Sequence, residues 1–269
     1  MREEKNKMEN SVWQDTVAVL WTGGWDSTYR VVELSRQDVN IQPVYILDKN
    51  RKSHLREIEA IRRIMNLLQA KEETKACFLP IDIVKVEDIP ANEAITQAWT
   101  RLHEEFHYGI QHEWTARLAA WKYPMINMCI EKVTKGYMPT REAIETYGAV
   151  QWISGQGYVI DRDRSSEVLK LVLGEICLPI FETTEVEMLQ RVKQWGYMDV
   201  MENIWFCHHP IQGKPCGLCS PCHTKLDSGM AFLLPEAAQR RRIKQQWMEQ
   251  HLGKLAVKAY AKATRAIHR

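Results

Sequence analysis

The sequence lacks both of the common glycine-rich phosphate-binding motifs. Neither a Gly-x4-Gly-Lys-Ser/Thr loop nor a complete Gly-x-Gly-x-x-Gly loop occurs anywhere in its 269 residues. Without a loop lysine to contact the terminal phosphates of a nucleotide, simple transfer of a γ-phosphate is disfavoured.

Long apolar runs and a strong overall charge are also missing. No run is long enough to span a bilayer, and residues 1–10 are charged and contain no hydrophobic signal region. The net charge of +2 implies no particular partner, and a hydrophobic share of 45% is enough for a packed core. We therefore expect a soluble, cytoplasmic protein without membrane contact, made of one large domain or of one domain with an appendage.

The number and placement of the cysteines disfavour disulfides. There are seven, an odd number, and four of them crowd into one segment near the C-terminus. This pattern favours a metal site. The other three, Cys77, Cys129 and Cys177, lie in apolar stretches and are most simply core residues.

Near the N-terminus the sequence contains a strand, a glycine turn and the start of a helix. Residues 16–21 are an apolar run of strand length, Gly23 and Gly24 permit a tight turn, and a helical pattern begins near Ser27. The polar residues 26–28 are of types that cap helices. Such a turn aims several backbone N–H groups at one point next to the positive end of a helix, which predicts a phosphate-binding loop.

This loop resembles that of a known superfamily. Its sequence Thr-Gly-Gly-Trp-Asp-Ser-Thr at residues 22–28 is similar to the Ser-Gly-Gly-x-Asp-Ser loop of the PP-loop ATP pyrophosphatases, and Thr22 keeps the hydroxyl of the usual serine. The resemblance implies that ATP, bound with Mg²⁺, is cleaved between its α and β phosphates to adenylate a substrate. It implies catalytic roles for Asp26 and Ser27. The ATP-binding residues expected from it are Leu20, Trp21, Thr22, Gly23, Gly24, Trp25, Asp26, Ser27 and Thr28.

Further strands are expected at residues 41–48, 77–84 and 125–131. Two of them end in an acid, and the carboxyl ends of strands in open α/β sheets face the ligand crevice. We expect Asp48 to contact the ribose or adenine of ATP, unless it is only a turn residue. Glu131 could bind Mg²⁺ or a substrate amino group, or could be a solvated strand end.

A second glycine turn, at residues 108–111, precedes a helix expected at residues 112–122. In this type of fold such a turn helps to enclose nucleotide and substrate. Gln111 and Arg117 are therefore candidate substrate or phosphate contacts, although Arg117 could equally be a surface residue. Two other helices are expected at residues 51–70 and 92–107.

Residues 149–160 alternate apolar and polar side chains around a Gly-Gln-Gly turn and predict a β-hairpin, inserted as a lid or as an interface. A helix is expected at residues 165–175. Another begins after Thr184, with Glu187 completing a capping box, and ends at Gly196.

The four clustered cysteines have the spacing Cys-x8-Cys-x2-Cys-x2-Cys, and they are Cys207, Cys216, Cys219 and Cys222. Two-residue spacers let sulfur atoms from one tight turn converge on one ion, and four sulfurs satisfy the tetrahedral preference of Zn²⁺ without an open position. We therefore predict a structural zinc site. An iron–sulfur cluster is the main alternative. His208, His209 and His223 are spare ligands, any of which could replace a cysteine.

The cysteine segment and the N-terminal loop together resemble the 7-cyano-7-deazaguanine synthases. The segment shares with them its cysteine spacing, a tryptophan two residues before the first cysteine, and the sequence Pro-Cys-Gly-x-Cys. His54 and Glu57 are similar to a short Arg-His-x-x-Glu signature of that family, with Ser53 in place of the arginine, and are candidate substrate contacts. His223, where the family usually has arginine, the hairpin and the C-terminal extension depart from the family pattern.

This resemblance implies a ligase that adenylates the carboxylate of a 7-deazaguanine. Ammonia then displaces AMP to give an amide, and a second ATP converts the amide into a nitrile. One alternative is transfer of the activated acid to an amine of a protein partner. Another is a tRNA-thiolating PP-loop enzyme, which would need a reactive cysteine near the loop.

The resemblance also implies an α/β fold with a Rossmann-like (HUP-type) parallel sheet, helices on both faces and a small C-terminal zinc segment. To these the residue patterns add a β-hairpin insertion and a helical tail. We expect an ATP-binding domain at residues 1–235, including the zinc segment at 203–226, and an extension at 236–269.

Residues 237–269 carry nine Lys or Arg and one acid, Glu249. Apolar residues at helical spacing predict one or two basic amphipathic helices, packed on the body or on a second subunit as a homodimer, or docked to an acidic partner or nucleic acid. The residues of this stripe are Ile243, Trp247, Leu252, Leu255 and Ala259.

Overall fold

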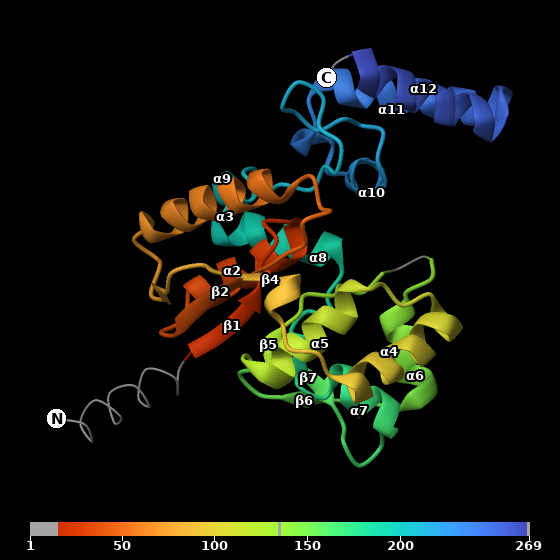
Figure 1. The fold of residues 1–269 in the computed structure, drawn as a ribbon. Helices are drawn as coiled ribbons and strands as arrows, with labels where there is room; N and C mark the ends of the chain where they lie inside the picture. Colours follow the sequence, from red (N-terminus) through yellow and green to blue (C-terminus); the bar gives the residue numbers. More distant parts are fainter. Residues whose placement is uncertain (1–15, 134–135, 268–269) are drawn as a thin grey trace.

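The computed structural model describes residues 16–133 and 136–267, so the expectation for residues 1–10 lies outside the described residues. Its centre is a six-stranded sheet in which every pairing is parallel (Figure 1). The path through the sheet is β3-β2-β1-β5-β8, and β4 also pairs with β2. The strands are β1 Thr16–Leu20, β2 Asn40–Leu47, β3 Cys77–Phe78, β4 Asp82–Lys85, β5 Ile126–Asn127 and β8 Ile176–Cys177.

The direction of strand addition reverses between β1 and β5. Strands β2 and β3 are added on one side of β1, whereas β5 and β8 follow on the other. In open parallel sheets, ligands bind at the carboxyl ends of the strands beside such a reversal. The topology therefore places the ligand site after Leu20, where the glycine loop begins.

Helices cover both faces of the sheet, which confirms the predicted α/β class. One hydrophobic core lies between the sheet and one group of helices, namely α2 Trp25–Ser35, α3 His54–Gln69, α8 Glu185–Trp195 and α9 Met198–Met201. The opposite core lies against α4 Glu93–Phe106, α5 Gln111–Trp121, α6 Pro139–Tyr147 and α7 Glu167–Leu173. Val44 and Tyr45, neighbours in β2, belong to different cores because successive strand residues point to opposite faces.

Three details of the predicted elements are wrong. The expected strand at 77–84 is divided into β3 and β4, because Pro80 between them has no N–H to donate to a ladder. The strand expected at 125–131 is only the two residues of β5, so Glu131 lies beyond a strand end. Helix α2 begins at Trp25 with Gly24 as N-cap, and therefore residues 26–28 form its first turn instead of capping it.

The predicted hairpin is present as β6 Val150–Ile153 and β7 Gly157–Ile160. It packs against the edge of the central sheet, where the Leu178 N–H donates to the Tyr158 carbonyl at 2.7 Å. The guanidinium of Arg30, on α2, donates to the carbonyl of Gln156 in the hairpin turn at 3.2 Å. The capping box of Thr184 and Glu187 on α8 is also confirmed, and Gly196 ends this helix.

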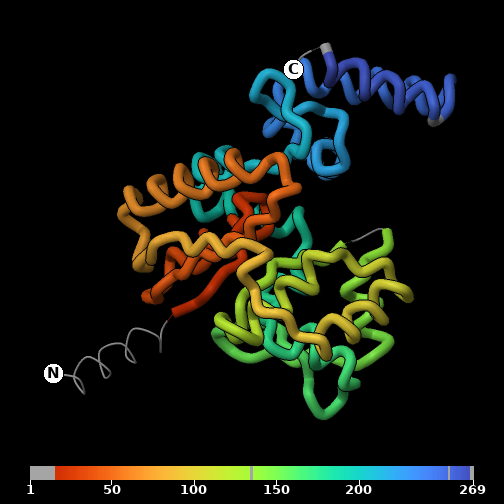
Figure 2. The backbone as a smooth tube through the Cα atoms, in the orientation of Figure 1, coloured from red at the N-terminus to blue at the C-terminus, as the bar shows by residue number. Residues whose placement is uncertain are grey.

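The chain ends in the cysteine segment and two tail helices that lie side by side (Figures 1 and 2). These elements are α10 Ser220–Asp227, α11 Glu236–His251 and α12 Gly253–Ile267, and two short 3-10 turns, η1 Val86–Asp88 and η2 Ala231–Leu233, complete the list of elements. Among the described residues, no helix is both long and apolar enough to cross a bilayer.

The tail packs on the cysteine segment through contacts that the sequence pattern did not predict. Gly217 has a φ of +73°, and a Cβ there would lie 2.0 Å from the Ala238 carbonyl oxygen on α11. The Arg241 guanidinium donates to the Cys216 carbonyl at 2.8 Å, and that of Arg265 donates to the Leu218 carbonyl at 3.1 Å. The tail is therefore seated on the turn that carries two of the cysteines.

The predicted apolar stripe of the tail does not face the body. Its members Ile243, Trp247, Leu252, Leu255 and Ala259 are all exposed. Contacts with the cysteine segment use Ala238, Tyr260 and Ala261 instead. This orientation corrects the expectation that the stripe packs on the body, whereas the division of the chain at residue 235 and a homodimer stay predictions.

Candidate active site

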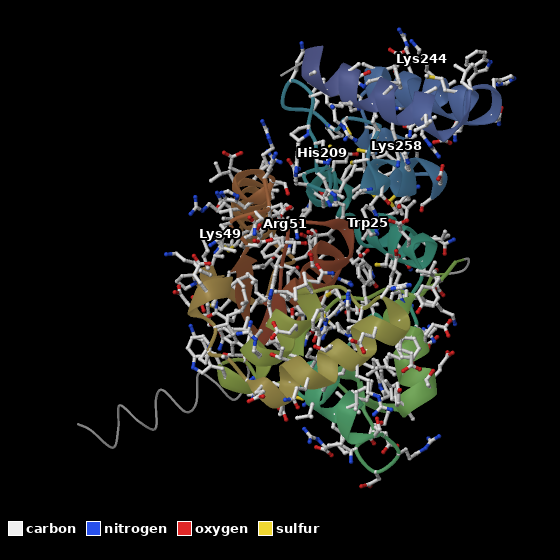
Figure 3. All side chains as sticks on the ribbon, turned by 45° about the vertical axis from the view of Figure 1, so that its right-hand side comes forward. Trp25, Lys49, Arg51, His209, Lys244 and Lys258 are labelled. Carbon is white, nitrogen blue, oxygen red and sulfur yellow. The ribbon has the colours of Figure 1, made fainter. Side chains whose placement is uncertain are left out.

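A cavity of about 730 Å³ opens at the carboxyl ends of β1, β2 and β5, and the cysteine segment forms part of its wall. Its volume lies in the range of sites for small-molecule ligands. In Figure 3, Trp25 and Arg51 lie near the middle of the molecule, and His209 of the cysteine segment lies above them. The lining residues used below are Leu20, Thr22, Gly24, Trp25, Asp26, Ser27, Asp48, Arg51, Ser53, Gln111, His112, Cys129, His208 and His209.

The glycine loop is held from two sides. Gly23 has a φ of +72°, a conformation that favours glycine, and a Cβ there would lie 3.1 Å from the Glu57 carbonyl oxygen of α3. The Gly23 carbonyl accepts a 2.8 Å hydrogen bond from the N–H of Trp205, which lies just before the first clustered cysteine. Contacts with α3 on one side and with the cysteine segment on the other therefore fix the backbone conformation of the loop.

Within the predicted ATP-binding set, the structure separates residues that line the cavity from residues that support it. The cavity is lined by Leu20, Thr22, Gly24, Trp25, Asp26, Ser27 and Asp48. Trp21, Gly23 and Thr28 are absent from the lining. Trp21 and Thr28 are fully buried, and the indole N–H of Trp21 donates to the Thr28 hydroxyl at 3.0 Å, behind the loop.

Three polar atoms at the start of α2 have no partner among the described residues. They are Nε1 of Trp25, Oδ1 of Asp26 and Oγ of Ser27, and all three are shielded from solvent. Buried polar atoms normally have a hydrogen-bonding partner, so such atoms in a cavity wall indicate where a ligand would bind. They lie at the N-terminus of α2, where the helix dipole also favours an anion.

The Asp26 carboxylate belongs to a cluster that the sequence did not reveal. Oxygen atoms of Asp26, Glu131 and Glu185 all lie within 4.8 Å of one another. The ammonium group of Lys225 pairs with Glu185, and both side chains are almost fully buried. Four charged groups are thus brought together from three helices, α2, α8 and α10, and from the segment after β5.

The pKa values in this cluster are shifted in the directions expected from burial. Burial raises the pKa of Asp26, and the positive charge of Lys225 partly offsets this. Burial and then the charge of Asp26 raise the pKa of Glu131 to about 7, again against the effect of Lys225. Burial lowers the pKa of Lys225, although both carboxylates favour its charged form. Oxygen ligands at such spacing suit a hard divalent cation.

Two of the candidate substrate contacts support the cavity instead of lining it. Glu57 is buried, and its carboxylate accepts from the Tyr45 hydroxyl at 2.6 Å, from Arg51 Nε at 2.9 Å and from the Ser53 hydroxyl at 2.6 Å. Nδ1 of His54 lies 2.7 Å from the Arg51 carbonyl. Glu57 thereby holds Arg51 and Ser53, which do line the cavity.

The two candidates on α5 also differ in position. Gln111 lines the cavity, whereas Arg117 does not. The Arg117 guanidinium donates twice to Glu113, at 2.7 and 2.9 Å, and also donates to the carbonyls of Ile89 and Pro90. It therefore ties α5 to the end of the η1 loop.

His112, which the sequence pattern did not single out, also lines the cavity. Burial lowers its pKa to about 4, so the imidazole is neutral at physiological pH, and its Nδ1 has no partner among the described residues. A lone histidine at the start of a predicted helix carries no local signal of this role. Only the packing of the second glycine turn beside β5 brings it to the site.

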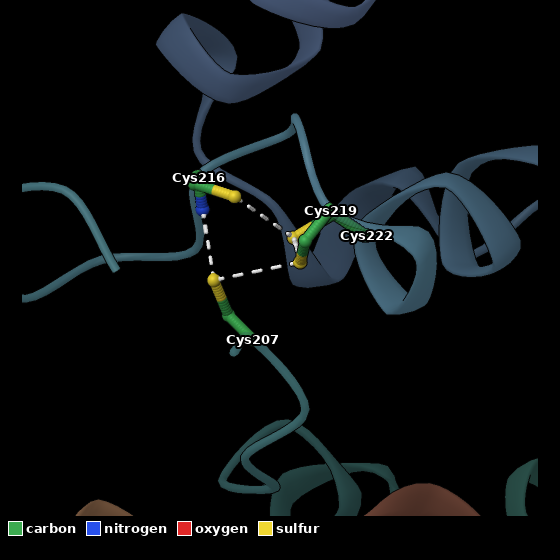
Figure 4. A group of neighbouring side chains, drawn as sticks. All are labelled: Cys207, Cys216, Cys219 and Cys222. Atoms are coloured by element: carbon green, nitrogen blue, oxygen red, sulfur yellow. Dashed lines mark hydrogen bonds between the residues drawn. The ribbon is translucent and has the colours of Figure 1, made fainter. Parts of the chain in front are cut away.

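The four clustered cysteines converge as their spacing predicts (Figure 4). Their sulfur atoms all lie within 4.8 Å of one another, and the contacts between them are 3.4 to 3.9 Å. Sulfurs on a tetrahedral zinc ion with Zn–S bonds of about 2.3 Å would lie about 3.8 Å apart. Such spacing leaves little room for the additional sulfides of an iron–sulfur cluster, so this group could hold a single metal ion such as zinc.

Backbone N–H groups donate to two of the four sulfurs. The Cys216 N–H donates to Sγ of Cys207, and the Leu218 N–H donates to Sγ of Cys216, both at 3.2 Å. These donors stabilise negative charge on the sulfurs. The spare histidines do not join the group: His223 contacts Gln245 of α11 at 3.1 Å, and His208 and His209 line the cavity.

Comparison with known proteins agrees with this architecture. The family model described as queuosine biosynthesis protein QueC matches residues 16–231, which include the loop, the sheet and the cysteine segment. No curated protein matches the chain significantly.

Proposed function

We propose that this protein uses ATP to activate the carboxylate of a 7-deazaguanine. The proposal starts from the finding that the chain belongs to the QueC family of queuosine biosynthesis proteins. The family is one of ATP pyrophosphatase and ligase enzymes. The proposal rests mainly on the cavity between the glycine loop and the cysteine segment. Asp26 and Ser27 line this cavity, and each has a buried side-chain oxygen without a hydrogen-bonding partner among the described residues.

In this mechanism, a carboxylate oxygen of the substrate attacks the α-phosphorus of ATP, and pyrophosphate leaves. Ammonia then attacks the acyl carbon, loses a proton and displaces AMP, which yields an amide. A second ATP activates the amide oxygen in the same way, and loss of AMP and protons yields a nitrile. The protein must stabilise phosphate charge at each attack, and fixed backbone dipoles do so without reorganising.

The residues at the start of α2 would meet this demand. Backbone N–H groups of residues 24–27 and the Ser27 hydroxyl would donate to phosphate oxygens. Asp26 and Glu131 would hold Mg²⁺, which when bound neutralises part of the phosphate charge. Asp48, at the end of β2, would contact the ribose or adenine.

The substrate would occupy the part of the cavity beside α5. Gln111 and the neutral His112 would contact the deazapurine, and Arg51 would attract its carboxylate. We assign positioning roles to Glu57, His54 and Arg117, because their polar atoms are occupied by neighbours. Zinc on the four cysteines would be structural, since four sulfurs leave no position for water.

The test is to incubate the protein with ATP, Mg²⁺, ammonium and 7-carboxy-7-deazaguanine, and to analyse the products by mass spectrometry. We expect AMP, pyrophosphate and the nitrile. Formation of ADP and inorganic phosphate, or no nucleotide turnover with a panel of deazapurine acids, would overturn the proposal.

One observation favours a protein amine, in place of ammonia, as the acceptor of the activated acid. The tail, beyond the residues that match the family, exposes an apolar and basic surface that includes Trp247 and Leu255, and Lys244 and Lys258 lie on its helices (Figure 3). Such a surface could bring an amine of a protein partner to the activated acid. AMP formation without nitrile, restored by adding a partner protein, would indicate this variant.

The properties of Cys129, the cysteine near the glycine loop, disfavour the tRNA-thiolating alternative. Cys129 lines the cavity, but burial raises the pKa of its thiol, which opposes the thiolate that sulfur transfer needs.

A further inference from the structure

Lys225 is an unusual residue to bury. Its side chain is 9% exposed, and it lies three positions after the last clustered cysteine, on α10. It pairs with Glu185, and its ammonium nitrogen lies 5.4 Å from the centre of the ring of Trp25, the first residue of α2. A buried ammonium is costly unless it is paired, so its location requires compensation by the groups around it.

The groups that face Lys225 are the three clustered carboxylates. They are Glu185 from α8, Asp26 from α2 and Glu131 from the segment after β5. A pair with Glu185 alone would neutralise Lys225. Asp26 and Glu131 bring further negative charge within reach of the same ammonium, so Lys225 holds together carboxylates that would otherwise repel one another.

The position of Lys225 depends on the cysteine segment. Helix α10 begins at Ser220, with Cys219 as its N-cap, and contains Cys222. Convergence of these sulfurs on one point therefore sets the direction in which α10 leaves the segment. The backbone N–H of Trp205, at the other end of the segment, donates to the Gly23 carbonyl. The segment therefore contacts both the glycine loop and the start of α2.

We propose that Lys225 is a positioning residue through which the cysteine segment controls nucleotide binding. Its ammonium, held by Glu185, keeps Asp26 and Glu131 close together at the start of α2, in the arrangement that Mg²⁺·ATP requires. Lys225 thus supplies from the C-terminal segment a positive charge that the glycine loop itself lacks. This inference rests on the proposed function, because it concerns the same site.

Metal occupancy of the cysteines and nucleotide binding are then thermodynamically coupled. Mg²⁺·nucleotide should raise the affinity of the cysteines for zinc, and removal of zinc should weaken nucleotide binding by the same factor, because the coupling free energy between two sites is reciprocal. A merely structural ion pair would affect the midpoint of thermal unfolding but not this coupling.

The test compares Lys225→Met and Lys225→Arg with the wild type. Binding of Mg²⁺ with α,β-methylene-ATP is measured by calorimetry, and the affinity for zinc is measured by equilibrium competition with a chelator, with and without this nucleotide. We expect Lys225→Met to weaken nucleotide binding at least about tenfold and to abolish the effect of nucleotide on zinc affinity, and Lys225→Arg to retain both. Wild-type nucleotide affinity in Lys225→Met, or an unchanged effect of nucleotide on its zinc affinity, would overturn the proposal.

Two further variants keep the result interpretable. The double variant Glu185→Gln/Lys225→Met removes both members of the pair, so it folds without an uncompensated charge from that pair and should show the same loss of affinity. Lys122→Met removes a half-exposed lysine paired with Asp82 and should bind nucleotide like the wild type. Neither measurement uses a deazapurine acid or turnover, so failure of the proposed reaction would leave this test valid.

Discussion

The two clusters of metal-compatible side chains in this protein differ in how they are assembled. The four cysteines lie between residues 207 and 222, and short turns bring their sulfurs together. The three carboxylates lie between residues 26 and 185, and the packing of the sheet and of separate helices brings them together. The first cluster is nearly a local structure, whereas the second exists only in the folded domain.

This difference has an energetic consequence. Metal bound to the cysteines would stabilise the fold, because its binding free energy becomes folding free energy. Burial instead raises the pKa values of two of the carboxylates, Asp26 and Glu131, so their ionised forms oppose folding. A side chain that lowers stability and lines a cavity, as Asp26 does, indicates function more strongly than side chains that raise stability.

Cys222→Ser should give the largest effect, because it removes a sulfur from the local cluster. Structural zinc in peptides binds with about 10–16 kcal/mol of apparent free energy, and we expect much of this contribution to be lost. Zinc content by mass spectrometry and the midpoint of thermal unfolding should both fall. Cys77→Ser should change neither, because Cys77 lies outside the cluster and is exposed, which corrects the expectation that it is a core residue. Unchanged zinc content in Cys222→Ser would contradict the assignment.

Asp26→Asn should show the opposite pattern in the carboxylate cluster. We expect AMP formation to fall about 100- to 1,000-fold in kcat, as when a group that stabilises transition-state charge is removed. Stability at neutral pH should be retained or increased, because a buried carboxylate is eliminated. Asp38→Asn, at an exposed position, is the control for both measurements. A variant that loses stability and activity in parallel would make Asp26 structural.

Gly217→Ala tests how closely the tail is seated on the cysteine segment. A Cβ at Gly217 would collide with the Ala238 carbonyl, whereas one at Gly213, with a similar φ of +76°, would lie 3.7 Å from flexible Arg56 atoms. Both substitutions introduce similar backbone strain, so the difference between their losses of stability reports the collision alone. We expect Gly217→Ala to lose about 2 kcal/mol more than Gly213→Ala. Denaturant unfolding and proteolysis near residue 235 measure it. Equal destabilisation would show that α11 is not seated there.

The smallest effect should be the pH dependence that Glu131 contributes in the absence of Mg²⁺. Its folded-state pKa of about 7 is above its ordinary value, so the folded protein binds the proton more tightly than the unfolded chain. The contribution to stability is therefore complete below the ordinary pKa and is lost as the pH rises through 7. After allowance for solvent screening it should be on the order of 1 kcal/mol. Denaturant unfolding at pH 5 and pH 8 should differ less in Glu131→Gln than in the wild type, and an identical difference would refute this.

Much of the fold could be predicted because its signals are periodic or local. The strand–turn–helix around Gly23 and Gly24, the hairpin and the capping box of Thr184 depend on residues close in the chain. The predicted third strand failed at Pro80, where a missing N–H outweighs the apolar pattern. The tail was wrongly oriented because helical periodicity identifies an apolar face but not what covers it.

The site could be predicted only in part for the same reason. Asp26 and Ser27 belong to a recognisable loop, whereas His112 and Lys225 are single polar residues in helices, and such residues are usually solvated. Arg117 fitted a phosphate contact by type and position, yet Glu113, one helical turn before it, provides a local partner at hydrogen-bonding distance. Glu57 shows the converse, a signature residue whose carboxylate is occupied by three neighbours.

The sequence alone determined the glycine turn and the cysteine group, because the residues that form each of them are close together in the chain. Only the tertiary structure decided that Lys225 meets Asp26, Glu131 and Glu185 beneath that turn. Burying like charges at one point is unfavourable for any short segment, and it is tolerated here because two hydrophobic cores stabilise the elements that carry them.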